Sequence, residues 1–186
     1  MTDTETINNK INKIRERIRS IPDYPKPGIM FRDITTLLKD PDGLFDSVDV
    51  LSGKLDSLEF NKVAAIDARG FIFGAAISFF YKKGFIPVRK KNKLPGDVIS
   101  EEYELEYGMD QMELHVDAIQ NGDKILLVDD LIATGGTAIA AISLIERLGG
   151  VIAAASFVVG LPDLGGITKL KDKGYLITTI CDFEGE

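Results

Sequence analysis

The sequence predicts one α/β domain built on a central, mostly parallel β-sheet with helices on both faces. Two observations predict this class. Short apolar segments without polar alternation recur along the chain, as in strands that are buried on both faces, and segments with helical spacing lie between them. The length of 186 residues suits a single domain with a sizeable core.

The first third of the chain predicts two helices around an irregular segment. Apolar residues recur every three or four positions within 7–19, which predicts an amphipathic helix. Three prolines and a glycine then exclude regular structure from Pro22 to Gly28. Helical spacing of apolar residues returns over 43–56 and predicts the second helix.

The remainder of the chain alternates strands with helices. The apolar runs predict strands at 62–66, 85–89, 124–130, 151–159 and 175–180. Helices are expected over 71–84 and 137–148, the first ended by Gly84 and the second by the pair Gly149 and Gly150.

The segment 99–116 departs from this alternation. Its residues alternate between apolar or aromatic and acidic types on both sides of Gly108, which predicts an antiparallel hairpin inserted into the α/β pattern. The basic, Gly/Pro-containing segment RKKNKLPGD precedes it directly. Residues 89–116 therefore predict a mobile lid.

Composition limits the possible functions. The net charge of −7 argues against a nucleic-acid-binding protein, and no apolar run reaches the roughly 18–20 residues of a membrane span. The polar N-terminus does not resemble a secretory signal. With a single cysteine, Cys181, the chain has no internal disulfide, and we expect a cytoplasmic protein.

The segment KILLVDDLIATGGT, residues 124–137, predicts a ligand site. Asp129 and Asp130 end a buried strand, where ligands bind in open parallel sheets, and adjacent carboxylates there need a metal ion or ligand hydroxyl groups to compensate them. The turn Thr134–Thr137 leads into a helix N-terminus, which favours bound phosphate. A ribose 5-phosphate would satisfy both parts.

Several segments together resemble the type I phosphoribosyltransferases. The run LLVDDLIATGGT resembles the phosphoribosyl-pyrophosphate motif of that family. Further segments resemble the adenine-specific branch of that family. They are PDYPKPGIMFRDITTLL at 22–38, IDARGFIFG at 66–74, VRKKNKLPG at 88–96 with YELEYG at 103–108, and GLPDLGG at 160–166. The resemblance covers roughly residues 20–181.

The resemblance implies the type I phosphoribosyltransferase fold in a single domain, 1–186, with a small hood formed mainly by 1–34 and the region around 160–166. It also implies roles for individual residues in binding phosphoribosyl pyrophosphate. Asp129 and Asp130 would bind the ribose hydroxyls. The other expected contacts are Ala133, Thr134, Gly135, Gly136 and Thr137 for the 5′-phosphate, and Asp67, Ala68, Arg69, Arg89, Lys90 and Lys93 for the pyrophosphate.

The implied reaction joins adenine to the phosphoribosyl group and gives AMP and pyrophosphate. Phe31 and Leu161 would cover the two faces of adenine, and backbone groups around Met30 and Arg32 would contact its edge. Glu106 matches the family's proposed catalytic glutamate, with Tyr107 beside it in the lid. Arg69 would assist catalysis, and Mg²⁺ would be held mainly by substrate and water.

The family resemblance also suggests a homodimer to which residues 1–34 could contribute. Two alternatives stay open at this point. The chain could transfer the phosphoribosyl group to a different purine base, or it could be a regulator that binds phosphoribosyl pyrophosphate without catalysis.

Overall fold

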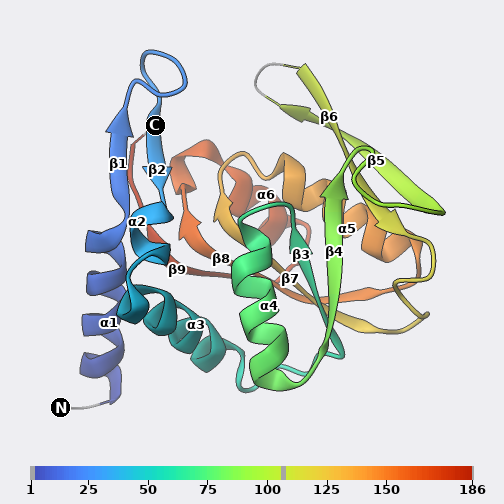
Figure 1. The fold of residues 1–186 in the computed structure, drawn as a ribbon, viewed down its shortest axis with the longest axis horizontal. Helices are drawn as coiled ribbons and strands as arrows, with labels where there is room; N and C mark the ends of the chain where they lie inside the picture. Colours follow the sequence, from blue (N-terminus) through green and yellow to red (C-terminus); the bar gives the residue numbers. More distant parts are fainter. Residues whose placement is uncertain (1–2, 106–107, 186) are drawn as a thin grey trace.

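Seven strands form one mixed sheet in the computed structural model, which describes residues 3–105 and 108–185 (Figure 1). The spatial order is β5-β6-β4-β3-β7-β8-β9. The strands are β3 (Lys62–Ile66), β4 (Gly84–Lys90), β5 (Val98–Leu105), β6 (Gly108–His115), β7 (Lys124–Ile132), β8 (Val151–Gly160) and β9 (Ile177–Asp182). Pairing is parallel from β4 to β9 and antiparallel where β6 meets β4 and β5. The predicted α/β class with an inserted hairpin is confirmed.

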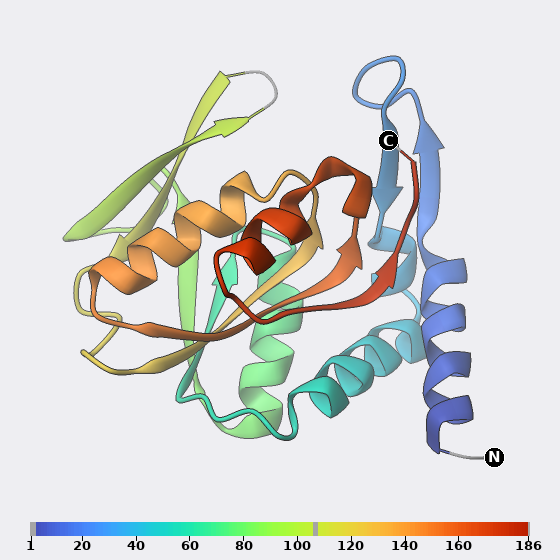
Figure 2. The same ribbon diagram turned by 180° about the vertical axis from the view of Figure 1, so that it is seen from behind.

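Helices cover both faces of this sheet. One face carries α1 (Asp3–Arg17), α3 (Pro41–Leu55) and α4 (Gly70–Tyr81), with the short α2 (Thr35–Leu38) beside them (Figure 1). The opposite face carries α5 (Gly136–Arg147) and α6 (Gly166–Asp172), while the single turn η1 (Pro162–Leu164) leads into α6 (Figure 2).

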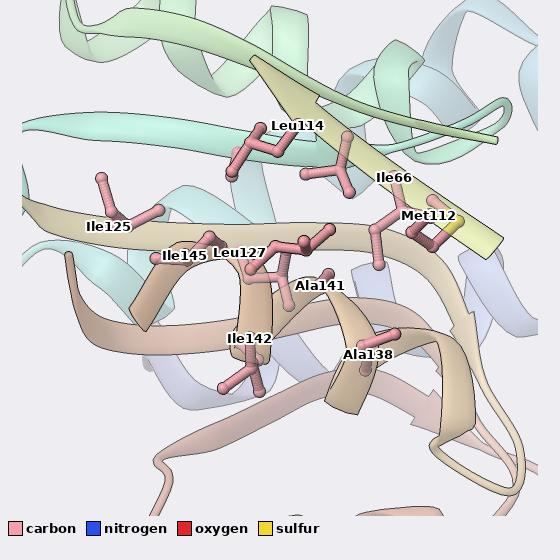
Figure 3. Packing of buried hydrophobic residues seen from close by; sticks show 14 of the residues in the cluster. Ile66, Met112, Leu114, Ile125, Leu127, Ala138, Ala141, Ile142 and Ile145 are labelled. Carbon is pink, nitrogen blue, oxygen red and sulfur yellow. The ribbon is translucent and has the colours of Figure 1, made fainter. Parts of the chain in front are cut away.

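Each face has its own hydrophobic core, because successive strand residues point to opposite sides of the sheet. In β3, Ala64 and Ile66 belong to the core under α5, and Val63 and Ala65 belong to the core under α4. Figure 3 illustrates the first of these cores, in which apolar residues of β3, β6 and β7 pack against α5. The central strands β3 and β7 therefore pack against a hydrophobic core on each of their two faces.

A second, two-stranded sheet lies beside the main one and was not predicted. It pairs β1 (Arg19–Pro22) with β2 (Met30–Asp33), and the Pro-rich segment between them forms the connecting loop (Figures 1 and 2). The prolines that argued against regular structure over 22–28 therefore fall in the loop and at the last residue of β1. This hairpin and the C-terminal segment lie side by side in both views.

One predicted helix end is wrong. We expected Gly84 to end the helix at 71–84, but α4 ends at Tyr81 and Lys82 takes the left-handed conformation, with φ of 52°. Gly84 instead starts β4. Among the described helices, none is both long and apolar enough to cross a membrane.

Candidate active site

A cavity of about 630 Å³ opens at the carboxyl ends of β3 and β7. Because the two strands are parallel neighbours, the segments that follow them meet at one edge of the sheet. The lining residues are Ile66, Asp67, Ala68, Arg69, Arg89, Lys90, Lys93, Tyr103, Asp129, Asp130, Leu131, Ile132, Ala133, Thr134, Gly135, Gly136, Thr137 and Ala138. All the residues expected to contact phosphoribosyl pyrophosphate thus line one cavity.

The adjacent carboxylates Asp129 and Asp130 form the floor at the end of β7. Asp130 is buried and Asp129 is half-buried. The Nε atom of Arg69 lies 2.9 Å from Oδ2 of Asp130, yet within the described ranges that oxygen accepts no hydrogen bond. This ion pair therefore leaves a buried acceptor available to a hydroxyl donor.

Burial raises the pKa of both carboxyl groups in this acidic pair. Burial raises the pKa of Asp129 well above its ordinary value, and the neighbouring charge of Asp130 adds to the effect. Burial also raises the pKa of Asp130, although the charge of Arg69 opposes it. Groups with such shifts are common where a ligand or metal completes the charge balance.

The predicted phosphate cradle is a tight turn at the N-terminus of α5. Gly135 is the N-cap residue, and its φ of 83° favours glycine. Thr134, just before the helix, and Thr137, in its first turn, line the cavity beside the backbone amides. Unpaired amides and the helix dipole favour an anion at such a position.

A neighbouring glycine braces this cradle from behind. The amide of Gly166, at the start of α6, donates to the carbonyl oxygen of Ala133 at 2.9 Å. A Cβ atom on Gly166 would lie 2.3 Å from that same oxygen and 2.6 Å from the amide nitrogen of Gly135. The close approach of the two backbones therefore requires glycine. This role of Gly166 was not predicted, and the Gly165–Gly166 pair is the feature of the sequence that could have indicated it.

Three of the four predicted pyrophosphate cations, Arg69, Arg89 and Lys90, are each paired with a carboxylate of the chain. Besides the Arg69 pair, Arg89 donates through Nε to Oδ2 of Asp67 at 3.1 Å and through Nη1 to the carbonyl of Lys93 at 3.0 Å. The third cation, Lys90, lies 3.1 Å from Asp110. A bound anion would therefore compete with internal carboxylates for these positive charges.

The contact between two residues of the lid hairpin, Tyr103 and Asp110, was not predicted from the sequence. The hydroxyl group of Tyr103, which lines the cavity, lies 3.1 Å from Oδ2 of Asp110, and burial raises the pKa of Tyr103 to about 12. Although burial alone would raise the pKa of Asp110, the Gln111 amide and Lys90 lower it. The two residues lie directly opposite each other in the β5–β6 pairing. Their contact could therefore be predicted only from the register of the hairpin.

The residues expected to contact a purine lie outside this cavity lining. Met30, Phe31 and Arg32 are on β2, which has a strand partner on one edge only within the described ranges. Leu161 is buried between β8 and η1. The guanidinium carbon of Arg69 lies 5.7 Å from the Phe31 ring centroid, so one side chain joins the β2 segment to the cavity.

The aromatic ring of Phe31 also has a neighbour that sequence analysis missed. Tyr24 contacts it edge to face, with ring centroids 5.1 Å apart. Glu106 and Tyr107, expected in the lid, lie outside the described residues.

Comparison with known proteins places these features in a family context. The model of the phosphoribosyl transferase domain matches residues 35–182. Adenine phosphoribosyltransferase of Chlorobium limicola is 57% identical over 175 residues, which cover 93% of this chain and 99% of that protein.

Solved structures with the same fold include two adenine phosphoribosyltransferases. That of Thermoanaerobacter pseudethanolicus has a TM-score of 0.89 at 45% identity, covering 93% of this chain and 99% of that one. That of Saccharomyces cerevisiae, complexed with adenine and an imino-altritol bisphosphate, has a TM-score of 0.86 at 31% identity, covering 94% and 99%.

Proposed function

The chain belongs to the phosphoribosyltransferase family, and from that premise we propose that it is an adenine phosphoribosyltransferase of the type I fold. It transfers the 5-phosphoribosyl group of phosphoribosyl pyrophosphate to N9 of adenine and yields AMP and pyrophosphate. One observation carries this proposal: the acidic pair, the phosphate cradle and the paired cations line a single cavity. The identity of 57% to a named adenine phosphoribosyltransferase supports the choice of base.

In this proposal the cavity binds the sugar phosphate at two points. The amides and hydroxyls of 134–137 hold the 5′-phosphate at the N-terminus of α5. The carboxylates of Asp129 and Asp130 accept hydrogen bonds from the ribose hydroxyls, which satisfies the buried Oδ2 atom of Asp130. Ala133, Thr134, Gly135, Gly136 and Thr137 are the proposed phosphate contacts.

The chemical step breaks the bond between C1 of the ribose and the pyrophosphate oxygen. The bonding electrons leave with pyrophosphate, and the sugar gains oxocarbenium character. Cationic side chains at the cavity wall stabilise the leaving charge, and they do so more strongly once the proposed lid closes and excludes water. The proposed groups are Arg69, Arg89, Lys90 and Lys93, with Asp67 and Ala68 in the turn that holds Arg69.

The donor set is compatible with a magnesium ion held mainly by the substrate and water. Among the described residues no group of three or more His, Cys, Asp or Glu side chains could hold a metal by itself. Asp129 and Asp130 supply hard oxygen atoms beside the proposed ribose position, and Oδ2 of Asp130 accepts no hydrogen bond from residues 3–105 or 108–185. When bound, Mg²⁺ would neutralise charge on the pyrophosphate.

The base is proposed to lie between Phe31 and Leu161, next to the open edge of β2. Backbone groups of Met30 and Arg32 would contact its edge there. We assign Glu106 to hold or accept the purine proton as N9 attacks C1, with Tyr107 completing the lid over the site.

The hood would comprise the segment up to residue 34 together with 160–166, and the lid about 89–116, all in one domain. A cytoplasmic location is supported by the single cysteine.

The test is a turnover assay with purified protein. Adenine, phosphoribosyl pyrophosphate and Mg²⁺ together should give equal amounts of AMP and pyrophosphate, and omission of any one should abolish both products. The products are separated by chromatography. Binding of phosphoribosyl pyrophosphate without turnover of any base would instead support a regulator.

We further infer that a second copy of this chain covers the outer face of α4. A helix that is apolar on all sides is normally buried, yet Ile72, Phe79 and Phe80 are 41%, 87% and 59% exposed. Ile72, Ala75 and Phe79 form one helical stripe. Aromatic residues gathered in this way are typical of the centre of a protein–protein interface.

Phe79→Glu should separate the proposed homodimer into monomers, because the substitution places a charge at the most exposed aromatic residue of this stripe. Light scattering coupled to size-exclusion chromatography should give twice the chain mass of 20.4 kDa for the parent and the chain mass for the variant. Val151→Glu is the matched control, since Val151 is an exposed apolar residue at the start of β8. A parent protein that elutes as a monomer would contradict the proposal.

A further inference from the structure

The segment 183–185, directly after β9, contacts both segments that the proposed function assigns to the base. The amide of Phe183 donates to the carbonyl of Gly160 at 2.9 Å, next to Leu161. The amide of Gly185 donates to Oδ2 of Asp163 at 2.8 Å. These bonds fix the segment against the turn between β8 and η1.

The other contacts of this segment reach β2. The guanidinium carbon of Arg32 lies 4.4 Å from the centroid of the Phe183 ring, and that of Arg15, on α1, lies 5.5 Å from it. The Nη1 atom of Arg32 also donates to Ser20 on β1. Phe183 therefore connects the hairpin, which its ring contacts, to the β8–η1 turn, which its backbone amide contacts.

The ring of Phe183 is one of the contacts that hold Arg32. The Nε atom of this half-buried side chain has no hydrogen-bond partner in the described part of the chain, so the aromatic face supports the cation together with the hydrogen bonds that its Nη atoms donate to Ser20 and to the carbonyl of Glu184. A two-stranded hairpin is marginally stable by itself and needs such outside support. Loss of the ring would leave β2 less firmly placed.

We propose that Phe183 is a positioning residue for base binding, which holds β2 and the Leu161 turn at a fixed separation through its contacts with Arg32 and Gly160. The inference rests on the proposed function, because it assigns the two walls to the base. Phe183 does not line the cavity at Asp129 and Asp130. Its effect should therefore fall on the base and spare phosphoribosyl pyrophosphate.

Phe183→Leu is the test, since leucine keeps an apolar side chain but has no aromatic face. We expect the KM for adenine to rise about tenfold, with kcat and the KM for phosphoribosyl pyrophosphate within twofold of the parent. Phe183→Tyr keeps the ring and should restore the parental KM. Arg15→Met is the matched control, because it removes the cation that belongs to α1 and leaves β2 attached.

Hydrogen exchange supplies a readout that needs no turnover. Amides of 30–33 should exchange faster in Phe183→Leu than in the parent, while those of β7 should not change. Unchanged exchange at 30–33, an unchanged KM for adenine, or an equal rise of both KM values would each overturn the inference. Failure of the parent to form AMP would overturn the proposed function instead, and the exchange result would still decide whether Phe183 holds β2.

Discussion

Adenine should be converted to nucleotide at least a thousand-fold more efficiently than hypoxanthine, guanine or xanthine, compared by kcat/KM (a conservative figure, since sites of this kind discriminate by about 10⁴-fold or more). Adenine offers a 6-amino donor and an N1 acceptor, whereas 6-oxopurines present the reverse pattern. Backbone groups at Met30 and Arg32 that match adenine would face like partners in a 6-oxopurine. Buried groups left unpaired in this way are costly.

Stacking cannot supply this discrimination, because every purine offers the same two faces to Phe31 and Leu161. Phe31→Ala should therefore weaken the binding of all bases and leave the ratio nearly unchanged. The measurement gives each base in turn to purified protein at saturating phosphoribosyl pyrophosphate and Mg²⁺, and separates the nucleotide product. Comparable turnover of hypoxanthine would reject adenine specificity but leave the phosphoribosyl transfer intact.

Gly166→Ala should reduce kcat/KM for phosphoribosyl pyrophosphate by roughly a hundredfold, an effect comparable to severe overpacking of a core. The new Cβ would lie 2.3 Å from the carbonyl oxygen of Ala133, 2.6 Å from the amide of Gly135 and 2.8 Å from the carbonyl carbon of Thr134. All three atoms belong to the backbone of the phosphate cradle. The cradle must therefore move, and its amides would no longer converge on one anion.

Gly165→Ala is the matched control for that variant. Unlike Gly166, Gly165 has a positive φ, 77°, but a Cβ there would meet no atom of the described residues within 4 Å. Backbone strain of about 1–2 kcal/mol should lower its stability and leave the affinity for phosphoribosyl pyrophosphate within a few-fold. Activity is compared per folded molecule, with the folded fraction taken from circular dichroism. Equal substrate affinities in the two variants would contradict the bracing role of Gly166.

Local patterns explain why most of the cavity could be predicted from the sequence. Asp129, Asp130 and the Thr134–Thr137 turn lie within one strand–turn–helix unit, so their relative positions follow from chain geometry alone. The turn after β3 is of the same kind and places Asp67 and Arg69 beside them, because β3 and β7 are parallel neighbours.

The features that sequence analysis missed depend on contacts between distant segments. Tyr103 reaches Asp110 only in one register of the hairpin, and a shift of one residue would send either side chain to the other face. The β1–β2 hairpin combines two four-residue strands around a Pro-rich loop. Strands of this length are too short to show a clear alternation of apolar and polar residues. The left-handed Lys82 at the end of α4 replaces the glycine that the usual rule expects.

The buried acidic pair has a consequence for the lifetime of the protein. A carboxyl group whose pKa is raised on folding binds more protons in the folded state than in the unfolded state. The free energy of unfolding therefore falls as the pH rises above the pKa that the group has in the unfolded chain. At neutral pH the acidic pair therefore makes the protein without ligand less stable than it would be with both carboxyl groups protonated. A ligand that binds only the folded site adds about 2.7 kcal/mol at a hundred times its Kd. We therefore expect resistance to proteolytic degradation to rise as more of the protein is bound to substrate, so that the amount of protein follows the supply of substrate.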